Sequence, residues 1–511
     1  MRNEVETIHG RVSGSETAGI RIFRGIPFAS PPIGARRFQP PEPPEPWADV
    51  RDATRVGPSA PQFAAPWFGW ISAAGVGHGD DCLSLNVWTP GLDEARRPVV
   101  VWIHGGGFLV GAGSTGVYDG RHLARRGDVV VVTINYRLGA LGYAHLKYHF
   151  GEGFEQSSNL GVRDQIAALE WVRDNVASFG GDPDNVSVFG QSAGAMSIAA
   201  LLGSSRARAL FTRAICQSGA ADHVTDPEAA GEVARTFIEC LGGPAASHEA
   251  LGRIPIGRIL QAQRDTMARL TSLENMMVFL PTVDDDVISE SPLDAAERGA
   301  TAEIPLLLGT TLDEWRLFRL IDPGVFGLRA HELTARFDQV LRGAFRSAPD
   351  GREAVESFRT ALETRGGRPS SAELWSAFQS ARVMHYPATR LAEAHTRGGG
   401  TAHAYLFTWR PPNLRRALGA CHGLDIPFVF GAVRHPLARP LTGFSTSAAR
   451  LSRKMQQAWI RFARHSDPGH YQLPDWIPYD EHRRATMLLG RTCRLADAPL
   501  EAERELLASW S

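Results

Sequence analysis

A serine between two glycines, directly after an apolar run, constrains the fold of this chain more than any other feature. Residues 185–189 predict a β-strand, and residues 190–194 continue it as Gly-Gln-Ser-Ala-Gly. This G-x-S-x-G pattern is typical of a sharp, strained turn from strand to helix that lifts the hydroxyl of Ser192 above a sheet edge. Larger side chains at Gly190 and Gly194 would clash in such a turn. The apolar residues 193–202 then predict a buried helix whose first N–H groups are free to face developing negative charge.

A glycine-rich loop upstream forms the second motif. Residues 99–103 predict a central strand, and residues 104–108 follow it as His-Gly-Gly-Gly-Phe. Consecutive glycines let backbone N–H groups approach an oxyanion closely, as in the oxyanion-hole loop of this type. A plain glycine-rich turn would explain this segment if it stood alone. The two motifs occur in the expected order, each after a predicted strand, and together they favour a serine hydrolase.

Further segments share a pattern with one family. They are residues 23–32, 80–87, 135–137, 159–165, 217–219, 309–314 and 422–428, in addition to the two motifs above. On these segments the chain resembles the type B carboxylesterases, a family that includes cholinesterases and bacterial para-nitrobenzyl esterases. The resemblance covers nearly the whole chain. It implies the α/β class and the α/β-hydrolase fold, with a central, mostly parallel sheet flanked by helices and with long insertions that form a lid and gorge.

The partners of Ser192 are expected further along the chain, because an α/β-hydrolase runs serine, acid, histidine. Nine histidines follow Glu314, and the residues alone do not choose among them. The resemblance selects His422, which stands in the family's His-Gly-x-Asp/Glu-Ile context. It likewise selects Glu314, which follows the apolar residues 304–308. A solvated acidic turn at Asp313 and Glu314 is the alternative interpretation.

The implied reaction is acyl transfer in two steps. His422 takes the proton of Ser192 during attack on an ester carbonyl, and Glu314 fixes the tautomer of the imidazole. The resemblance places the oxyanion hole at the N–H groups of three residues: Gly106, Gly107 and Ala193. We expect hydrolysis of small to medium uncharged carboxylic esters, with amide or carbamate hydrolysis as an alternative on the same residues.

Four more positions are weaker candidates by resemblance. Ser218 matches a buried serine near the acid, or is an ordinary serine at a strand end. Met277 and Phe279 align with acyl-pocket side chains, although such residues are more often core. Trp315 stands where a glycine is common, and either narrows the pocket or packs under the lid. Gln191 is a departure from the family pattern and not one of these four candidates. It stands where the family commonly has a glutamate, and this difference removes a charge beside Ser192.

Length alone would suggest about three domains, at roughly 150 residues each. Motifs near residues 104, 192, 314 and 422 must meet at one site, however. We therefore expect a single domain over residues 1–511, in which residues of about 222–300 and 316–395 form the lid and substrate gorge by resemblance.

Charge and cysteine usage bound the partners and the location. The formal net charge of −1 and the sequence pI near 7.0 favour neither nucleic acid nor anionic membranes. No apolar run reaches the roughly 18 residues of a membrane span, and no motif indicates a metal or other cofactor. In secreted relatives the cysteine that matches Cys82 forms a disulfide with a cysteine upstream of it. This chain has no cysteine before Cys82, and its first residues lack an apolar signal region. We expect a cytoplasmic bacterial protein, a monomer or weak oligomer, that acts on a small-molecule ester.

Two other function classes remain open at this point. One is a non-catalytic binding protein of the cholinesterase-like type, although such proteins lack a triad member and are secreted or tethered. The other is a nucleotide-dependent oxidoreductase, because residues 111–116 match the G-x-G-x-x-G fingerprint. The strand that follows ends in Asn135 and not in the acidic residue that binds a ribose hydroxyl, so a turn is the better interpretation.

Overall fold

A large mixed sheet organises the protein, whose computed structural model describes residues 3–63, 77–243, 247–273, 275–411 and 417–511. Within these residues the sheet has 11 strands in the order β14-β13-β12-β11-β10-β9-β7-β8-β6-β4-β3. In chain order the strands are β3 Ser15–Thr17, β4 Ile20–Pro27, β6 Ser84–Thr89, β7 Arg97–Ile103, β8 Val130–Ile134, β9 Gly181–Gln191, β10 Arg213–Gln217, β11 Leu306–Thr311, β12 Ala402–Phe407, β13 Ala485–Leu489 and β14 Arg494–Asp497. A smaller sheet joins β1 Glu4–Thr7, β2 Gly10–Ser13 and β5 Arg51–Asp52.

The seven central strands, from β13 to β8, pair in parallel, whereas the strands at both edges pair antiparallel. Strands β7 and β8 are buried along their whole length and rich in valine, because helices cover both faces of a parallel sheet. The chain passes from β7 to β8 on one side and then to β9 on the other. The carboxyl ends of β7 and β9 therefore lie side by side, where α/β sheets usually bind ligands.

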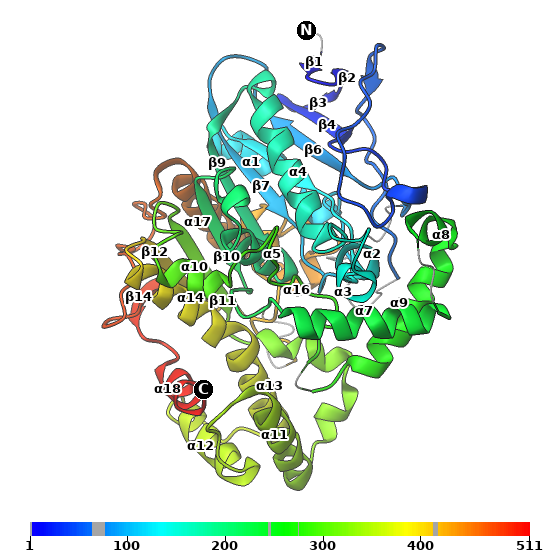
Figure 1. Ribbon diagram of the computed structural model, residues 1–511. Helices are drawn as coiled ribbons and strands as arrows, with labels where there is room; N and C mark the ends of the chain where they lie inside the picture. The colour runs from blue at the N-terminus through cyan, green and yellow to red at the C-terminus, as the bar shows by residue number, and fades with distance from the viewer. Residues whose placement is uncertain (1–2, 64–76, 244–246, 274, 412–416) are drawn as a thin grey trace.

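The described residues also form α-helices between and after the strands. They are α1 Arg121–Gly127, α2 Gly139–Tyr143, α3 Lys147–Phe150, α4 Leu160–Asn175, α5 Ala193–Leu202, α6 Ser205–Arg208, α7 Pro227–Leu241, α8 His248–Arg253, α9 Ile256–Leu270, α10 Pro292–Glu297, α11 Ala330–Ala344, α12 Gly351–Glu363, α13 Ser371–Ser380, α14 Tyr386–Arg397, α15 Ile426–Val429, α16 Arg439–Thr442, α17 Thr446–His465 and α18 Glu501–Trp510. In Figure 1, α4 and α5 lie across one face of the sheet. The helical periodicity predicted at residues 164–177 and 449–464 corresponds to α4 and α17.

A separate hydrophobic cluster lies away from the sheet. It joins α11, α12 and α13 to the C-terminal helix α18, with Phe337, Phe358, Phe378 and Trp510 among its buried members. Figure 1 shows these helices together at the end of the molecule opposite the N-terminal strands. The helices α11 to α13 of the segment from about 316 to 395 thus have their own packing, which α18 near the end of the chain completes, whereas α14 of the same segment packs in the main core.

No helix among the described residues combines the length and the apolar character that crossing a bilayer requires.

Candidate active site

The turn between β9 and α5 holds Ser192 in a strained conformation. Ser192 has φ 58° and ψ −129°, a sparsely populated region that costs of order 1–3 kcal/mol. A Cβ on Gly194 would lie 2.0 Å from the carbonyl oxygen of Ile103, and one on Gly190 would lie 2.6 Å from the backbone of Gly194. Both positions therefore need glycine. The Ser192 N–H donates to the carbonyl of Gln217 at 2.9 Å, which ties the turn to β10.

The loop after β7 lies directly against this turn. Gly106 and Gly107 have φ values of 121° and 63°, and a Cβ on Gly105 would lie 3.0 Å from the Cβ of Ser192. Among the described residues no hydrogen bond uses the N–H groups of Gly106 and Gly107. The Ala193 N–H is the first of α5 and has no partner within that helix. Three predicted oxyanion donors are thus free and lie on the two segments that meet at Ser192.

Buried aromatic side chains pack against the loop that follows β7. His104 stacks on Tyr136 with ring centroids 4.5 Å apart, and the Tyr136 hydroxyl donates to the carbonyl of His104 at 2.7 Å. Burial lowers the pKa of His104 to about 4, so its imidazole is neutral at pH 7. A Cβ on Gly111 would lie 2.4 Å from His104 Nδ1. Gly111 therefore packs against His104, and residues 113–114 form a turn, as the turn interpretation predicted.

Glu314 and His422 contact each other although 108 residues separate them. Glu314 begins the 3₁₀ turn η5, Glu314–Arg316, just after β11, and it is fully buried. Its Oε2 accepts a hydrogen bond from His422 Nδ1 at 2.5 Å, and its Oε1 accepts one from the Thr311 N–H at 2.6 Å. Burial by itself raises the pKa of Glu314, but the charge and hydrogen bond of His422, together with Ser218, outweigh it and leave this pKa below its ordinary value.

The neighbouring carboxylate of Asp313 points elsewhere. It accepts hydrogen bonds from Arg410 at 2.9 and 3.1 Å and from the Ala420 N–H at 2.9 Å. Neither carboxylate is solvated in the way that an exposed acidic turn would require, because the side chain of Asp313 is only 9% exposed and that of Glu314 is buried.

The other nitrogen of His422 faces Gln191. The amide nitrogen of Gln191 lies 3.1 Å from His422 Nε2, and no recorded hydrogen bond of the described residues joins Ser192 Oγ to His422. Phe318 lies 5.2 Å from the imidazole between ring centroids, and Trp315 packs on Phe318 at 4.5 Å. The N–H of Trp315 donates to Ser380 Oγ at 2.9 Å. Trp315 thus packs on Phe318, and Phe318 in turn lies beside His422.

The remaining candidates differ in how they relate to this centre. Ser218 has φ 52° and stabilises the charged form of Glu314, although its buried Oγ makes no hydrogen bond of good geometry. Phe279 is 1% exposed and belongs to the main hydrophobic core, against which the half-buried Met277 also packs. Their packing is that of core residues, and a role in an acyl pocket stays a prediction.

A second buried carboxylate lies beneath the histidine and was not singled out as functional from the sequence. Asp425 precedes α15 and is fully buried. Its Oδ2 accepts hydrogen bonds from Gln217 Nε2 at 2.9 Å and from the Tyr405 hydroxyl at 3.0 Å. Gln217 Oε1 in turn accepts from the indole of Trp459. The sequence contained only one hint of this network, namely an acid three residues after His422.

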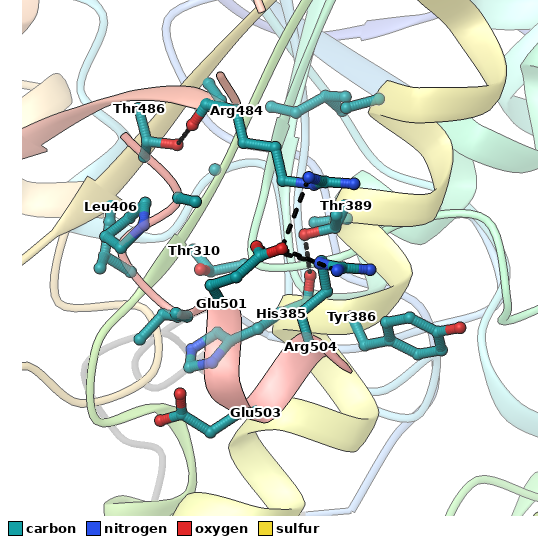
Figure 2. Close-up of a pocket in the computed structure, with 18 of the residues that line it drawn as sticks. Thr310, His385, Tyr386, Thr389, Leu406, Arg484, Thr486, Glu501, Glu503 and Arg504 are labelled. Atoms are coloured by element: carbon teal, nitrogen blue, oxygen red, sulfur yellow. Dashed lines mark hydrogen bonds and ion pairs between the residues drawn. The ribbon is translucent and has the colours of Figure 1, made fainter. Parts of the chain in front are cut away.

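A cavity of about 80 Å³ lies beside the end of β11 and is shown in Figure 2. Arg484 and Arg504 both approach Glu501 in its wall, at 3.5 and 2.7 Å. His385, the last residue of the π-helical turn η8, Ala381–His385, also lines it. His385 Nε2 contacts the carbonyl of Thr311 at 2.9 Å, and burial lowers the pKa of this histidine. A neutral His385 therefore braces the strand end that holds Glu314.

Comparisons with known proteins identify the family of this chain. The family model described as "Carboxylesterase family" matches residues 1–506. The chain belongs to the carboxylesterase family. The para-nitrobenzyl esterase of Bacillus subtilis is 37% identical over 510 residues, which cover 98% of each chain. The phenmedipham hydrolase of Pseudarthrobacter oxydans is 36% identical over 502 residues, 95% of this chain and 94% of that one. A crystal structure of a Geobacillus stearothermophilus carboxylesterase has a TM-score of 0.88 and 36% identity over the full length of both chains.

This carboxylesterase is accordingly a carboxylic ester hydrolase of the α/β-hydrolase fold, and the predictions of family, fold class and enzyme class are confirmed. The alternative of a non-catalytic binding protein is not favoured, because the relatives of this chain named above are enzymes. Among the described residues no cluster of three or more His, Cys, Asp or Glu side chains has the arrangement of a metal site.

Proposed function

We propose that this carboxylesterase hydrolyses small to medium uncharged carboxylic esters through an acyl-enzyme on Ser192. The observation that carries the proposal is the buried 2.5 Å contact between His422 Nδ1 and Glu314 at the strained turn of Ser192. Because Nδ1 donates to Glu314, Nε2 keeps its lone pair and is available as a general base. The mild overall charge of the chain fits neutral substrates.

The reaction proceeds by proton transfer and acyl transfer. His422 Nε2 takes the proton of the Ser192 hydroxyl as Oγ attacks the ester carbonyl, and it then gives this proton to the departing alkoxide. Water repeats the cycle on the acyl-enzyme and releases the acid. Glu314 holds the imidazole in one tautomer and stabilises its charged form. Its lowered pKa keeps this carboxylate ionised at neutral pH.

The tetrahedral oxyanion is bound by the N–H groups of Gly106, Gly107 and Ala193. These donors belong to a loop and a helix terminus that are fixed before substrate arrives, so little reorganisation accompanies the reaction. Loss of one such donor typically raises the barrier by about 3–4 kcal/mol.

The substrate gorge is formed by the segments of about 222–300 and 316–395 within a single domain over residues 1–511. Phe318 of the second segment packs beside His422, which supports this assignment. We also propose a cytoplasmic bacterial enzyme that acts as a monomer or weak oligomer. In support of the location, all five cysteines are free, as is usual in a reducing compartment.

Hydrolysis of para-nitrophenyl butyrate by the purified protein tests the proposal, with Ser192→Ala as the inactive variant. Ser187→Ala is a matched control, because Ser187 lies buried on β9, the strand that leads to Ser192, and its hydroxyl has no hydrogen-bond partner in the part of the chain that the structure describes. Nitrophenol release by the wild type and by Ser187→Ala, but not by Ser192→Ala, is the expected result. Equal release by Ser192→Ala would refute the assigned nucleophile. Fluorophosphonate labelling at Ser192 would show whether an unreactive probe ester is merely a poor substrate. Phenmedipham, named for one relative, is a second probe.

A further inference from the structure

The side chain of Gln191 contacts Nε2 of His422, which is the nitrogen that must accept the proton of Ser192. Gln191 is 1% exposed, and its amide nitrogen lies 3.1 Å from His422 Nε2. On the opposite ring nitrogen, Nδ1 contacts Glu314 at 2.5 Å. The imidazole is thus held from both ends, by a carboxylate on one side and by an amide on the other.

The orientation of the amide follows from these two contacts. A carboxylate with a lowered pKa is ionised and can only accept, so Nδ1 carries the proton. In the neutral imidazole Nε2 then has a lone pair, and a carbonyl oxygen placed against it would be repelled. The Gln191 NH₂ group must therefore face Nε2 and donate to it. Its oxygen faces the other way, 3.3 Å from a Cβ built on Gly105.

One in-plane lone pair on Nε2 accepts one strong hydrogen bond. Proton transfer from Ser192 requires the hydroxyl to donate to this same lone pair, yet the recorded contact belongs to Gln191. From this competition we infer that Gln191 is a positioning residue. It donates to Nε2 of His422 in the free enzyme and is displaced from this nitrogen when bound substrate brings the Ser192 hydroxyl into line. The inference rests on the proposed roles of Ser192 and His422.

Other titratable groups face His422 and must be separated from this effect. Glu314 on η5 and Asp425 before α15 interact with the charge of His422. Cys421 precedes His422 in the chain, and His385 interacts with Glu314. Burial raises the pKa of Cys421 to about 12, so this thiol stays neutral over the acid limb, and burial lowers the pKa of His385. Burial raises the pKa of Asp425 to about 6, and this group could contribute to an acid limb.

The test compares two pH profiles of the wild type with those of Gln191→Met, a neutral side chain of similar size that cannot donate. The profile of kcat/KM reports the free enzyme. The burst rate of nitrophenol release at saturating para-nitrophenyl butyrate reports acylation within the complex. Loss of one hydrogen bond to the neutral imidazole should move the acid limb of kcat/KM upward by about 0.4–1 pH unit. The limb of the burst rate should stay in place, because the contact is already broken there.

Gln191→Glu adds a second arm. A carboxylate facing Nε2 stabilises the charged imidazole, so this variant should move the limb of kcat/KM further upward than Gln191→Met does. Repeating Gln191→Met in the background of Asp425→Asn should preserve the shift, since the group observed is His422. Gln263→Met, which loses a buried amide on α9 that bonds Ala140, should leave the limb unmoved.

Three results would overturn the inference. They are an unmoved kcat/KM limb in Gln191→Met, an equal shift in both profiles, and a shift that disappears with Asp425→Asn. If Gln191→Met does not fold, as judged by circular dichroism, Gln191→Ala decides with the same readouts. Failure of the proposed function is distinguishable from these results, because it would appear as esterase activity in Ser192→Ala whatever the behaviour of Gln191.

Discussion

The effect of Asp425→Asn on the free energy of unfolding should be more favourable at alkaline than at acidic pH. The carboxylate is fully buried, and its Oδ1 has no hydrogen-bond partner among the described residues. Its Oδ2 accepts from Gln217 and Tyr405. Asparagine has the same shape, and its amide oxygen can keep both of these hydrogen bonds. The substitution therefore removes the buried charge, and its NH₂ group takes the place of Oδ1, where the described residues offer no acceptor, at a cost that does not depend on pH.

The size of the effect follows from the shifted pKa. Burial raises the pKa of Asp425 from 3.8 to about 6. Well below pH 3.8 the group is protonated in both the folded and the unfolded chain and contributes nothing. As pH rises to 6, the unfolded chain loses this proton first, so the folded state is progressively destabilised. At 1.36 kcal/mol per pKa unit, the loss is about 1.5 kcal/mol at pH 5 and about 3 kcal/mol at pH 8.

Urea unfolding of the wild type and of Asp425→Asn at pH 5 and pH 8 measures this difference. The free energy of unfolding of the variant relative to the wild type should be about 1.5 kcal/mol more favourable at pH 8 than at pH 5. Asp285→Asn, at an exposed position, is the control and should show no such difference. An effect that is the same at both pH values, or more favourable at pH 5, would refute the reasoning, because the effect would then not come from the buried charge.

Three other substitutions probe the site and its support. Gly194→Ala places a Cβ 2.0 Å from a carbonyl oxygen of β7, so this variant should yield little folded protein, measured by soluble expression and circular dichroism. Asp164→Asn leaves the guanidinium of Arg137, which is 1% exposed, without its carboxylate, and should lower the free energy of unfolding by about 3–5 kcal/mol in urea. Glu314→Gln keeps the shape of the side chain but no longer fixes the tautomer of the imidazole, and should lower kcat for para-nitrophenyl butyrate by about 10⁴-fold.

Matched variants separate these effects from general damage. Gly257→Ala adds a methyl group where nothing lies within 4 Å and should fold normally. Asp174→Asn breaks an exposed pair with Arg173 and should change stability by less than about 1 kcal/mol. Folded, active Gly194→Ala would contradict the packing argument. Near-normal turnover in Glu314→Gln would move the acid role to Asp313.

Local features of the site could be predicted because each depends on a few consecutive residues. The strained turn of Ser192 needs small residues at positions 190 and 194, and the loop after β7 needs positive φ values at Gly106 and Gly107. The strand predicted at residues 99–103 corresponds to β7, and the helix predicted at residues 164–177 corresponds to α4 with shifted ends. Helix ends are set by packing and capping as much as by periodicity, and for that reason the boundaries moved.

Contacts between distant segments could not be predicted in the same way. No local pattern distinguished His422 from the eight other histidines after Glu314, and only family resemblance selected it. The structure shows why Glu314 can meet His422: the ends of β11 and of the segment before α15 lie at the same edge of the sheet. From the sequence, Gln191 was interpreted only as the loss of a negative charge beside Ser192. In the structure its amide contacts a histidine 231 residues away.

The sequence by itself therefore determined the backbone chemistry of this carboxylesterase: the strained turn, the glycine loop and the order of the segments that carry the reacting groups. The tertiary structure decided which buried side chains face one another, namely Gln191 and Glu314 on the two nitrogens of His422, with Asp425 beneath. The physical reason is how far apart in the chain the interacting residues lie. Backbone strain is set by neighbours in the chain, whereas the environment of a buried polar group is set by whichever strands and helices pack around it.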